Sequence, residues 1–97
     1  MIFNTFVSKG QRRNLIPRIM VVDDEKDILS IIKRGLESDN IFKVDTFSSG
    51  ESALQAFESH PEYYYDIILT DIRMPKMSGF ELYRRIKRRD PRQKLHL

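Results

Sequence analysis

The chain has 97 residues, no cysteine and a formal net charge of +3. This length allows one small domain, and the absence of cysteine excludes disulfides and thiolate chemistry, as expected of a protein in a reducing cytoplasm. No apolar run approaches the roughly 18 residues that a membrane span requires. A signal peptide carries basic residues before its apolar segment, and this sequence has none there.

Charge is distributed unevenly along the chain. Residues 1–18 carry four basic and no acidic residues, residues 19–83 carry six basic and thirteen acidic residues, and residues 84–97 carry seven basic and one acidic residue. An acidic centre therefore lies between two basic ends. A basic pI can indicate nucleic-acid binding, but no helix-turn-helix, zinc-finger or RNA-binding pattern accompanies it, so we do not expect that ligand.

The N-terminal part of the chain predicts a tail, a strand and a helix. Residues 1–17 show no sustained periodicity and end at Pro17, so we expect a flexible basic tail. The apolar run 19–22 predicts the first strand. Asp24 can then cap a helix over about 25–38. The apolar stripe expected on this helix is formed by Ile28, Ile31, Ile32 and Leu36.

A second strand and a second helix follow. Residues 42–47 alternate between apolar and polar, which indicates an edge strand with one wetter face. Ser48 and Glu51 have the spacing of a capping box, and the helix that they open ends before Pro61. The residues expected to face the core on this helix are Ala53, Leu54 and Phe57.

The third repeat of strand and helix is followed by the start of a fourth strand. Residues 65–70 predict a strand, with Tyr63 and Tyr64 as its lead-in rather than a binding platform. A capping box at Ser78 and Glu81 opens a helix that ends at Asp90, and residues 95–97 begin a further strand. The expected core side of this helix carries Leu82, Tyr83 and Ile86. The alternation of strands and helices predicts an α/β fold with a parallel sheet.

Three aspartates follow apolar strands. Asp23 and Asp24 come after the first strand, and Asp71 comes after the third. If these strands are neighbours, the three carboxylates meet at one edge of the sheet, where open parallel sheets place their functional groups. Hard oxygen ligands suit Mg²⁺ together with a phosphoryl group. The alternatives are helix capping by Asp23 and Asp24, and a turn role for Asp71 before Met-Pro.

These segments resemble the receiver domain of two-component response regulators. The resemblance rests on Val21-Val22-Asp23-Asp24-Glu25 and on the segment that runs from Asp66 through Asp71-Ile72-Arg73-Met74-Pro75-Lys76-Met77-Ser78-Gly79 to Leu82. It covers residues 18–97, which we interpret as a partial receiver domain. It implies the flavodoxin-like doubly wound sheet, with helices on both faces and strand order 2-1-3-4-5.

The resemblance also implies roles for the site residues. Asp71 would be the phosphoacceptor, taking a phosphoryl group from a phosphohistidine of a sensor histidine kinase or a phosphotransfer protein. Mg²⁺ would be held by Asp24, Asp71 and the backbone carbonyl of Arg73, with Asp23 contributing through water. In the loop after the acceptor, Pro75 would fix φ and Gly79 would permit backbone conformations closed to other residues.

The sequence departs from the receiver pattern at its C-terminal end. Receiver domains carry a Ser or Thr after the fourth strand and a Lys after the fifth, whereas this sequence reaches only the start of the fourth strand. Neither Thr70 nor Lys94 matches these positions. We therefore expect only the first three strand–helix units and a stub of strand 4. A bare edge along Ile67–Leu69 would then favour marginal stability or self-association.

Three functions fit the sequence. The first is a phosphoacceptor that has no output domain of its own and acts on an unknown downstream target. The second is a truncated receiver that is not phosphorylated and is only a protein-interaction module or a gene remnant. The third is a Mg²⁺-dependent phosphatase. The sequence shows no second nucleophile or acid–base pair for this reaction, so we do not expect an enzyme.

His60 and His96 are expected to be plain surface residues. The arginine-rich helix after Gly79 is a solvated face, a surface for an acidic partner, or a contact for segments that the sequence lacks.

Overall fold

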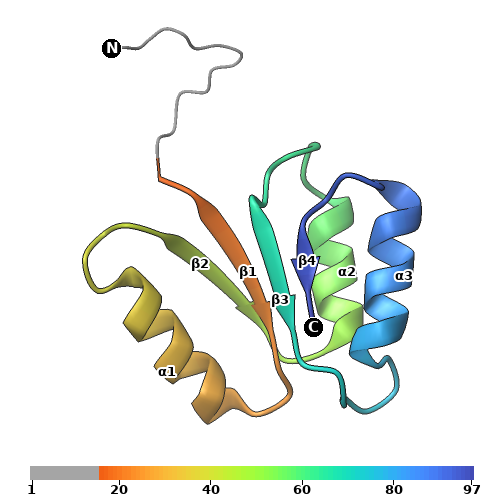
Figure 1. The fold of residues 1–97 in the computed structure, drawn as a ribbon. Coiled ribbons are helices and arrows are strands. Elements are labelled where there is room, and N and C mark those ends of the chain that lie inside the picture. The colour runs from red at the N-terminus through yellow and green to blue at the C-terminus, as the bar shows by residue number, and fades with distance from the viewer. Residues whose placement is uncertain (1–15) are drawn as a thin grey trace, which may run out of the picture.

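The computed structural model describes residues 16–97, so most of the predicted tail lies outside the described residues. Among the described helices, none has the length and apolar character that crossing a membrane requires. The elements follow the predicted order (Figure 1). They are β1 (Arg18–Val22), α1 (Lys26–Glu37), β2 (Lys43–Phe47), α2 (Gly50–Glu58), β3 (Ile67–Thr70), α3 (Gly79–Arg89) and β4 (Leu95–His96).

The four strands form one parallel sheet with the order β2-β1-β3-β4. Helix α1 lies on one face of this sheet, and α2 and α3 lie side by side on the other (Figure 1). Strands β1 and β3 are therefore neighbours, as the convergence of the aspartates requires. The layers and the strand order confirm the predicted flavodoxin-like fold class.

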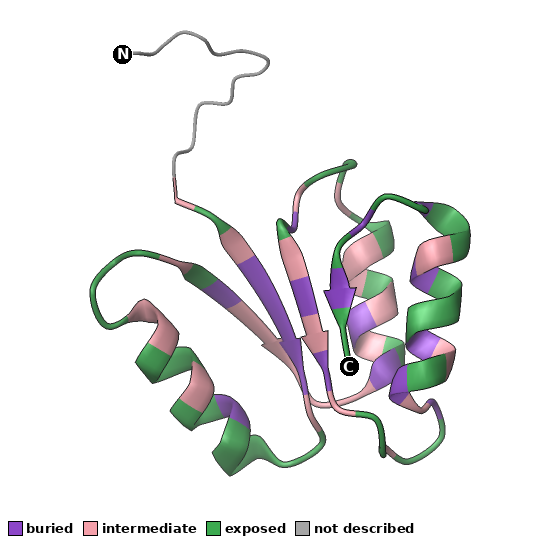
Figure 2. Ribbon diagram, in the orientation of Figure 1, coloured by how far each residue is buried: buried purple, intermediate pink, exposed green. Residues whose placement is uncertain are grey.

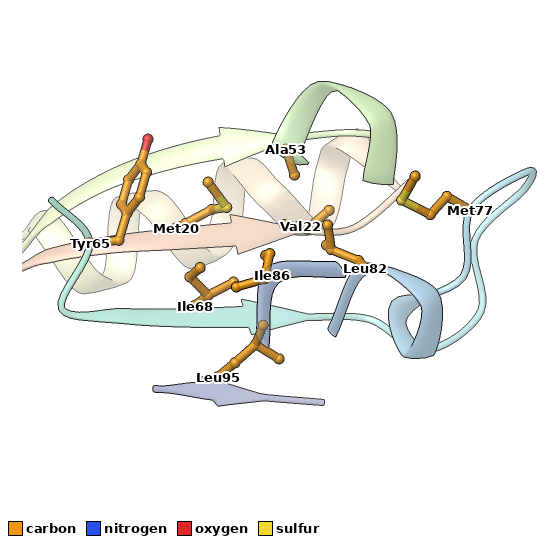
Figure 3. Packing of buried hydrophobic residues seen from close by; sticks show 9 residues of the cluster. All are labelled: Met20, Val22, Ala53, Tyr65, Ile68, Met77, Leu82, Ile86 and Leu95. Atoms are coloured by element: carbon orange, nitrogen blue, oxygen red, sulfur yellow. The ribbon is translucent and has the colours of Figure 1, made fainter. Parts of the chain in front are cut away.

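The core is built on β1, which is buried on both faces (Figure 2). Met20 and Val22 point toward α2 and α3, whereas Ile19 and Val21 point toward α1, because successive strand residues face opposite sides. The larger of the two clusters fills the space between the sheet and helices α2 and α3 (Figure 3). Its buried members are Met20, Val22, Ala53, Tyr65, Ile68, Met77, Leu82, Ile86 and Leu95.

Two predicted helix faces are partly wrong. On α1 the buried residue is Leu29, which is not part of the predicted stripe. Two residues of that stripe are exposed instead, Ile31 at 59% and Ile28 at 37%. Leu29 and the half-buried Ile32 and Leu36 pack toward the sheet, so the helix is rotated relative to the predicted stripe. On α3, Leu82 and Ile86 are fully buried as predicted, but Tyr83 is exposed.

Two of the three predicted caps also need correction. The N-cap of α1 is Glu25, without a side-chain capping bond, so Asp24 is not a cap. The N-cap of α2 is Ser49 rather than Ser48, and its hydroxyl accepts from Ser52 N at 3.1 Å. The cap of α3 is confirmed, because the Ser78 hydroxyl accepts a hydrogen bond from Glu81 N at 3.2 Å.

The edge of β3 is not bare, contrary to expectation. Ile68 and Leu69 pair with Leu95 and His96 of β4, and Ile68 N donates to Lys94 O at 3.0 Å. A two-residue strand is enough to satisfy these backbone groups. The open edge on this side of the sheet therefore belongs to β4, and we do not retain β3 as a self-association edge.

The tyrosines before β3 form a turn and an aromatic cluster rather than a strand lead-in. Tyr63 has a positive φ of 64°, and Tyr64 stacks on His60 with ring centres 3.7 Å apart. His60 is therefore half-buried in this cluster and is not a plain surface residue. The Tyr65 hydroxyl donates to Asp45 at 2.8 Å, and burial together with this carboxylate raises the pKa of Tyr65.

Glu37 links the end of α1 to the start of β2, and it gives the fold a testable pH dependence. Its carboxylate accepts from Val44 N at 2.8 Å and from Lys33 Nζ at 3.1 Å, and these bonds lower its pKa below 4.5. Because the pKa is lower in the folded state, the ionised carboxylate stabilises the fold at any pH above the pKa of the unfolded chain. This stabilisation disappears as the pH falls through the pKa of the folded state.

We expect Glu37→Gln to unfold at a lower urea concentration than the parent at pH 7. The gap should narrow as the pH falls below the ordinary pKa of a glutamate, whereas a constant gap would contradict this role.

Ile86 tests the position of the core. It is fully buried between α3 and the sheet, so Ile86→Val should lower the free energy of unfolding by about 1 kcal/mol. Ile31→Val removes the same methylene group from another helix, where the side chain is 59% exposed, and should change stability by less than about 0.5 kcal/mol. Urea unfolding measures both variants. Equal losses would mean that the two faces are assigned incorrectly.

Candidate functional site

Strand register brings the predicted aspartates together. Val22 pairs with Thr70 in the parallel β1–β3 ladder, so Asp23 and Asp71 are the next residues at the same edge of the sheet. Asp71 N donates to Val22 O at 2.8 Å, which fixes the start of the segment after β3 against β1. Asp24 follows on the turn into α1. The three side chains therefore come from two neighbouring strand ends.

The three carboxylates form a single acidic cluster. One oxygen from each of Asp23, Asp24 and Asp71 lies within 4.8 Å of the others, and none of the three side chains is buried. Like charges at this separation repel one another, so the cluster favours a bound cation. Because water reaches the cluster, solvent can complete the coordination of such a cation.

Hydrogen bonds orient two of these carboxylates and leave oxygens free. Asp23 Oδ1 accepts from Glu25 N at 2.9 Å, and Asp71 Oδ1 accepts from Ile72 N at 2.8 Å. The Oδ2 atoms of Asp23 and Asp71 therefore have no hydrogen-bond partner among the described residues. The Asp24 side chain makes no such bond within the described residues, and both of its oxygens remain available.

The cluster fits Mg²⁺ if one carboxylate acts through water. Mg²⁺ binds oxygens at about 2.0–2.1 Å in an octahedron, so opposite ligands lie about 4.2 Å apart. The span of up to 4.8 Å in the cluster is slightly larger than this. Two carboxylates can reach the ion directly after small side-chain rotations, and the third can reach it through a water. The donor set therefore matches the preference of Mg²⁺ for a few carboxylates and several waters.

Gly79, at the start of α3, lies directly against the backbone of the acceptor segment. Its N donates to Ile72 O at 2.8 Å. A Cβ at this position would overlap the backbone oxygen of Asp71 and lie 2.9 Å from the Asp71 carbonyl carbon. Gly79 does not have a positive φ, so the predicted reason for this glycine is wrong. It is required by the close approach of two backbones.

The loop between Asp71 and α3 holds the one strained residue near the site among the described residues. Lys76 adopts a φ of 69°, a conformation that non-glycine residues seldom take. The preceding Pro75 accepts at its carbonyl from Met77 N at 2.7 Å, which closes a tight turn. Met77 then points back into the core beside α2 (Figure 3). This anchored turn holds the loop that carries Arg73.

Other candidate residues lie apart from the acidic cluster. Lys94 precedes β4, so it lies at the opposite end of the parallel sheet from Asp71. The Thr70 hydroxyl donates to the backbone oxygen of Asp71 at 3.0 Å and is buried, which makes it part of the strand end. His96 and the exposed Leu97 instead line a hollow of about 170 Å³ that reaches Asp71. Sequence patterns did not indicate this hollow, because strand pairing creates it.

Comparison with known proteins is consistent with this geometry. Residues 19–96 match the family of response regulator receiver domains. A two-component response regulator of Oryza sativa subsp. japonica is 35% identical over 80 residues, which cover 82% of this chain and 58% of that protein. The chain spans less than two thirds of the length of the curated relatives that it matches.

Solved structures agree with the sequence matches. A response regulator receiver domain protein from Clostridium thermocellum superposes with a TM-score of 0.76 and 38% identity, over 82% of this chain and 62% of that one. The response regulator TrrA of Thermotoga maritima, solved with Mg(2+)-BeF, gives a TM-score of 0.74 and 36% identity, over 82% and 66% of the two chains. TrrA was also solved in complex with the histidine kinase ThkA. The present chain therefore belongs to the response regulator receiver domain family.

The contact at Gly79 predicts a sensitive position. Gly79→Ala must push α3 away from the acceptor segment, and we expect it to lower the free energy of unfolding by about 1–3 kcal/mol. Gly35→Ala is the matched control, because Gly35 lies in α1 with open space around it and alanine favours helices. The control should be neutral or stabilising by up to about 1 kcal/mol. Thermal and urea unfolding measure both variants, and a neutral Gly79→Ala would contradict the close approach.

Proposed function

We propose that this chain is a phosphoacceptor in two-component signal transduction, with Asp71 as the residue that carries the phosphoryl group. The observation that supports this most strongly is the cluster of Asp23, Asp24 and Asp71 at the carboxyl ends of two neighbouring strands. Membership of the receiver family supplies the reaction class. The proposed activity is phosphotransfer onto the chain itself, without turnover of a separate substrate.

Asp71 is suited to act as the nucleophile. Its Oδ1 is held by Ile72 N, so the other oxygen can attack a phosphorus atom along a fixed direction. In the proposed step this oxygen forms a bond to phosphorus while the bond from phosphorus to the donor histidine nitrogen breaks. The imidazole leaves with the electron pair of that bond and takes up a proton. The product is an acyl phosphate on Asp71.

Asp24, Asp71 and the backbone carbonyl of Arg73 are the proposed ligands of Mg²⁺, with Asp23 reaching it through water. When bound, the ion offsets the repulsion between the acceptor carboxylate and the incoming phosphoryl group. Asp23 is oriented by Glu25 N, and the Asp24 side chain is free to turn toward the ion. The relative TrrA was solved with Mg(2+)-BeF, which supports the binding of Mg²⁺ by this chain but does not identify the ligand residues.

The proposed donor is a sensor histidine kinase or a phosphotransfer protein in the cytoplasm. One relative, TrrA, forms a complex with the histidine kinase ThkA. The second candidate function is a receiver that binds partners without accepting phosphate. The hollow beside Asp71 favours this alternative, because no described lysine lies there to hold a phosphoryl group.

Intact mass after incubation with Mg²⁺ and a small acyl-phosphate donor tests the proposal. We expect one phosphoryl adduct on the parent chain and none on Asp71→Asn, because the nucleophilic oxygen is lost. Asp39→Asn makes the same substitution in an exposed turn far from the cluster and should retain the adduct. Asp24→Asn should require a higher Mg²⁺ concentration for the same yield.

Two outcomes would overturn this assignment. Equal uptake by the parent and by Asp71→Asn would place the acceptor elsewhere. No uptake by a parent chain with the far-ultraviolet circular dichroism of an α/β fold would favour the interaction module. Chelation of Mg²⁺ should abolish uptake, and uptake that persists under chelation would contradict the role of the metal.

A further inference from the structure

Helix α3 carries a dense basic surface that the acidic cluster does not use. Its last six residues include five cations, Arg84, Arg85, Lys87, Arg88 and Arg89. Leu82 and Ile86 hold the helix against the sheet, so the opposite side faces solvent. Part of this basic surface faces α2, which lies alongside α3 (Figure 1).

A groove separates the exposed sides of α2 and α3. It encloses about 570 Å³. Leu54 of α2 provides an apolar contact, and three arginines of α3 line it together with one carboxylate from each helix. The charged lining residues are Glu58, Glu81, Arg85, Arg88 and Arg89. The groove is therefore positively charged overall and has an apolar component.

The carboxylates in the groove neutralise only part of its positive charge. Glu81 forms ion pairs with Arg84 and with Arg85, and the distance to Arg85 is 2.7 Å. The hydrogen bond from Arg85 is the main cause that lowers the pKa of Glu81. Glu58 lies 3.9 Å from Arg89, at the limit of an ion pair. Arg88 has no ion-pair or hydrogen-bond partner among the described residues. The Arg88 guanidinium is therefore exposed in the groove and available to a ligand.

The arginines of α3 place like charges beside one another. Cations in the last turn of a helix interact favourably with its dipole, but like charges four residues apart repel one another. Arg84 and Arg88 form such a pair, and Arg85 and Arg89 form another. An anionic ligand would relieve both repulsions. An anion bound in the groove would therefore interact favourably with several neighbouring cations.

We infer that the α2–α3 groove binds a short acidic peptide segment of a partner protein, with carboxylates on Arg85, Arg88 and Arg89 and an apolar side chain on Leu54. Guanidinium groups form strong paired bonds to carboxylates, which provides the polar recognition. The groove follows α3, whose eleven residues extend about 16 Å. An extended peptide of about five residues covers this length. No residue that lines the groove belongs to the acidic cluster.

The composition of the groove favours a peptide over a nucleic acid. A phosphate backbone carries a charge at every step and would meet the carboxylates of Glu58 and Glu81. An alternating acidic and apolar peptide can place neutral side chains at these points and on Leu54. A duplex is also too wide to enter a groove between two packed helices.

Fluorescence anisotropy with a labelled peptide of about five alternating glutamate and leucine residues tests this inference. The full chain should bind this peptide more tightly than a peptide with glutamine in place of glutamate, and more tightly than a single-stranded oligonucleotide of equal net charge. Arg85→Gln combined with Arg88→Gln should weaken peptide binding about tenfold. Arg34→Gln combined with Lys43→Gln removes the same charge elsewhere and should change binding less than about twofold.

Three results would overturn the inference. Equal weakening by both double variants would mean that net charge, rather than the groove, attracts the peptide. Tighter binding of the oligonucleotide would assign the surface to nucleic acid. No preference for the glutamate peptide over the glutamine peptide would exclude recognition of carboxylates. Because all four substituted residues are exposed, circular dichroism of each variant should match that of the parent.

Discussion

The parallel pairing of β1 with β3 is the constraint on which the rest of the structure depends. Strand β1 is buried on both faces, so its side chains join the helices on the two sides of the sheet. The same register places Asp23 opposite Asp71. A shift by one residue would turn the apolar side chains of β1 to the wrong layers and separate the two carboxylates. Core packing and the acidic cluster are therefore fixed by one set of backbone hydrogen bonds.

Much of the fold could be predicted from local signals in the sequence. The apolar run before Asp23 indicated a strand buried on both faces, because no alternation with polar residues was present. Ser78 and Glu81 marked the start of α3 correctly, since this cap depends only on residues within one turn. The acidic cluster could be predicted because the strand ends and the strand order together determine which carboxylates meet.

The features that were predicted incorrectly depend on contacts between distant segments. The rotation of α1 that buries Leu29 and exposes Ile31 is set by packing on β1 and β2, which the helix sequence alone does not specify. The role of Gly79 depends on how closely α3 approaches Asp71, and sequence suggests only a need for unusual φ. Likewise, the α2–α3 groove requires two helices to lie side by side, so the arginines alone indicated only a charged surface.

The contact at Gly79 also determines how the segment after the acceptor can vary. Because Gly79 N is bonded to Ile72 O, residues 73–78 form a closed loop whose two ends are fixed together. The entropy of closing such a loop increases slowly with length. Added length would therefore cost little by itself, but residues inserted after Lys76 would break the bond from Met77 N to Pro75 O that closes the turn holding Arg73. A reporter group attached to the exposed side chain of Lys76 avoids this loss, because it leaves the backbone turn, the acceptor and α3 in place.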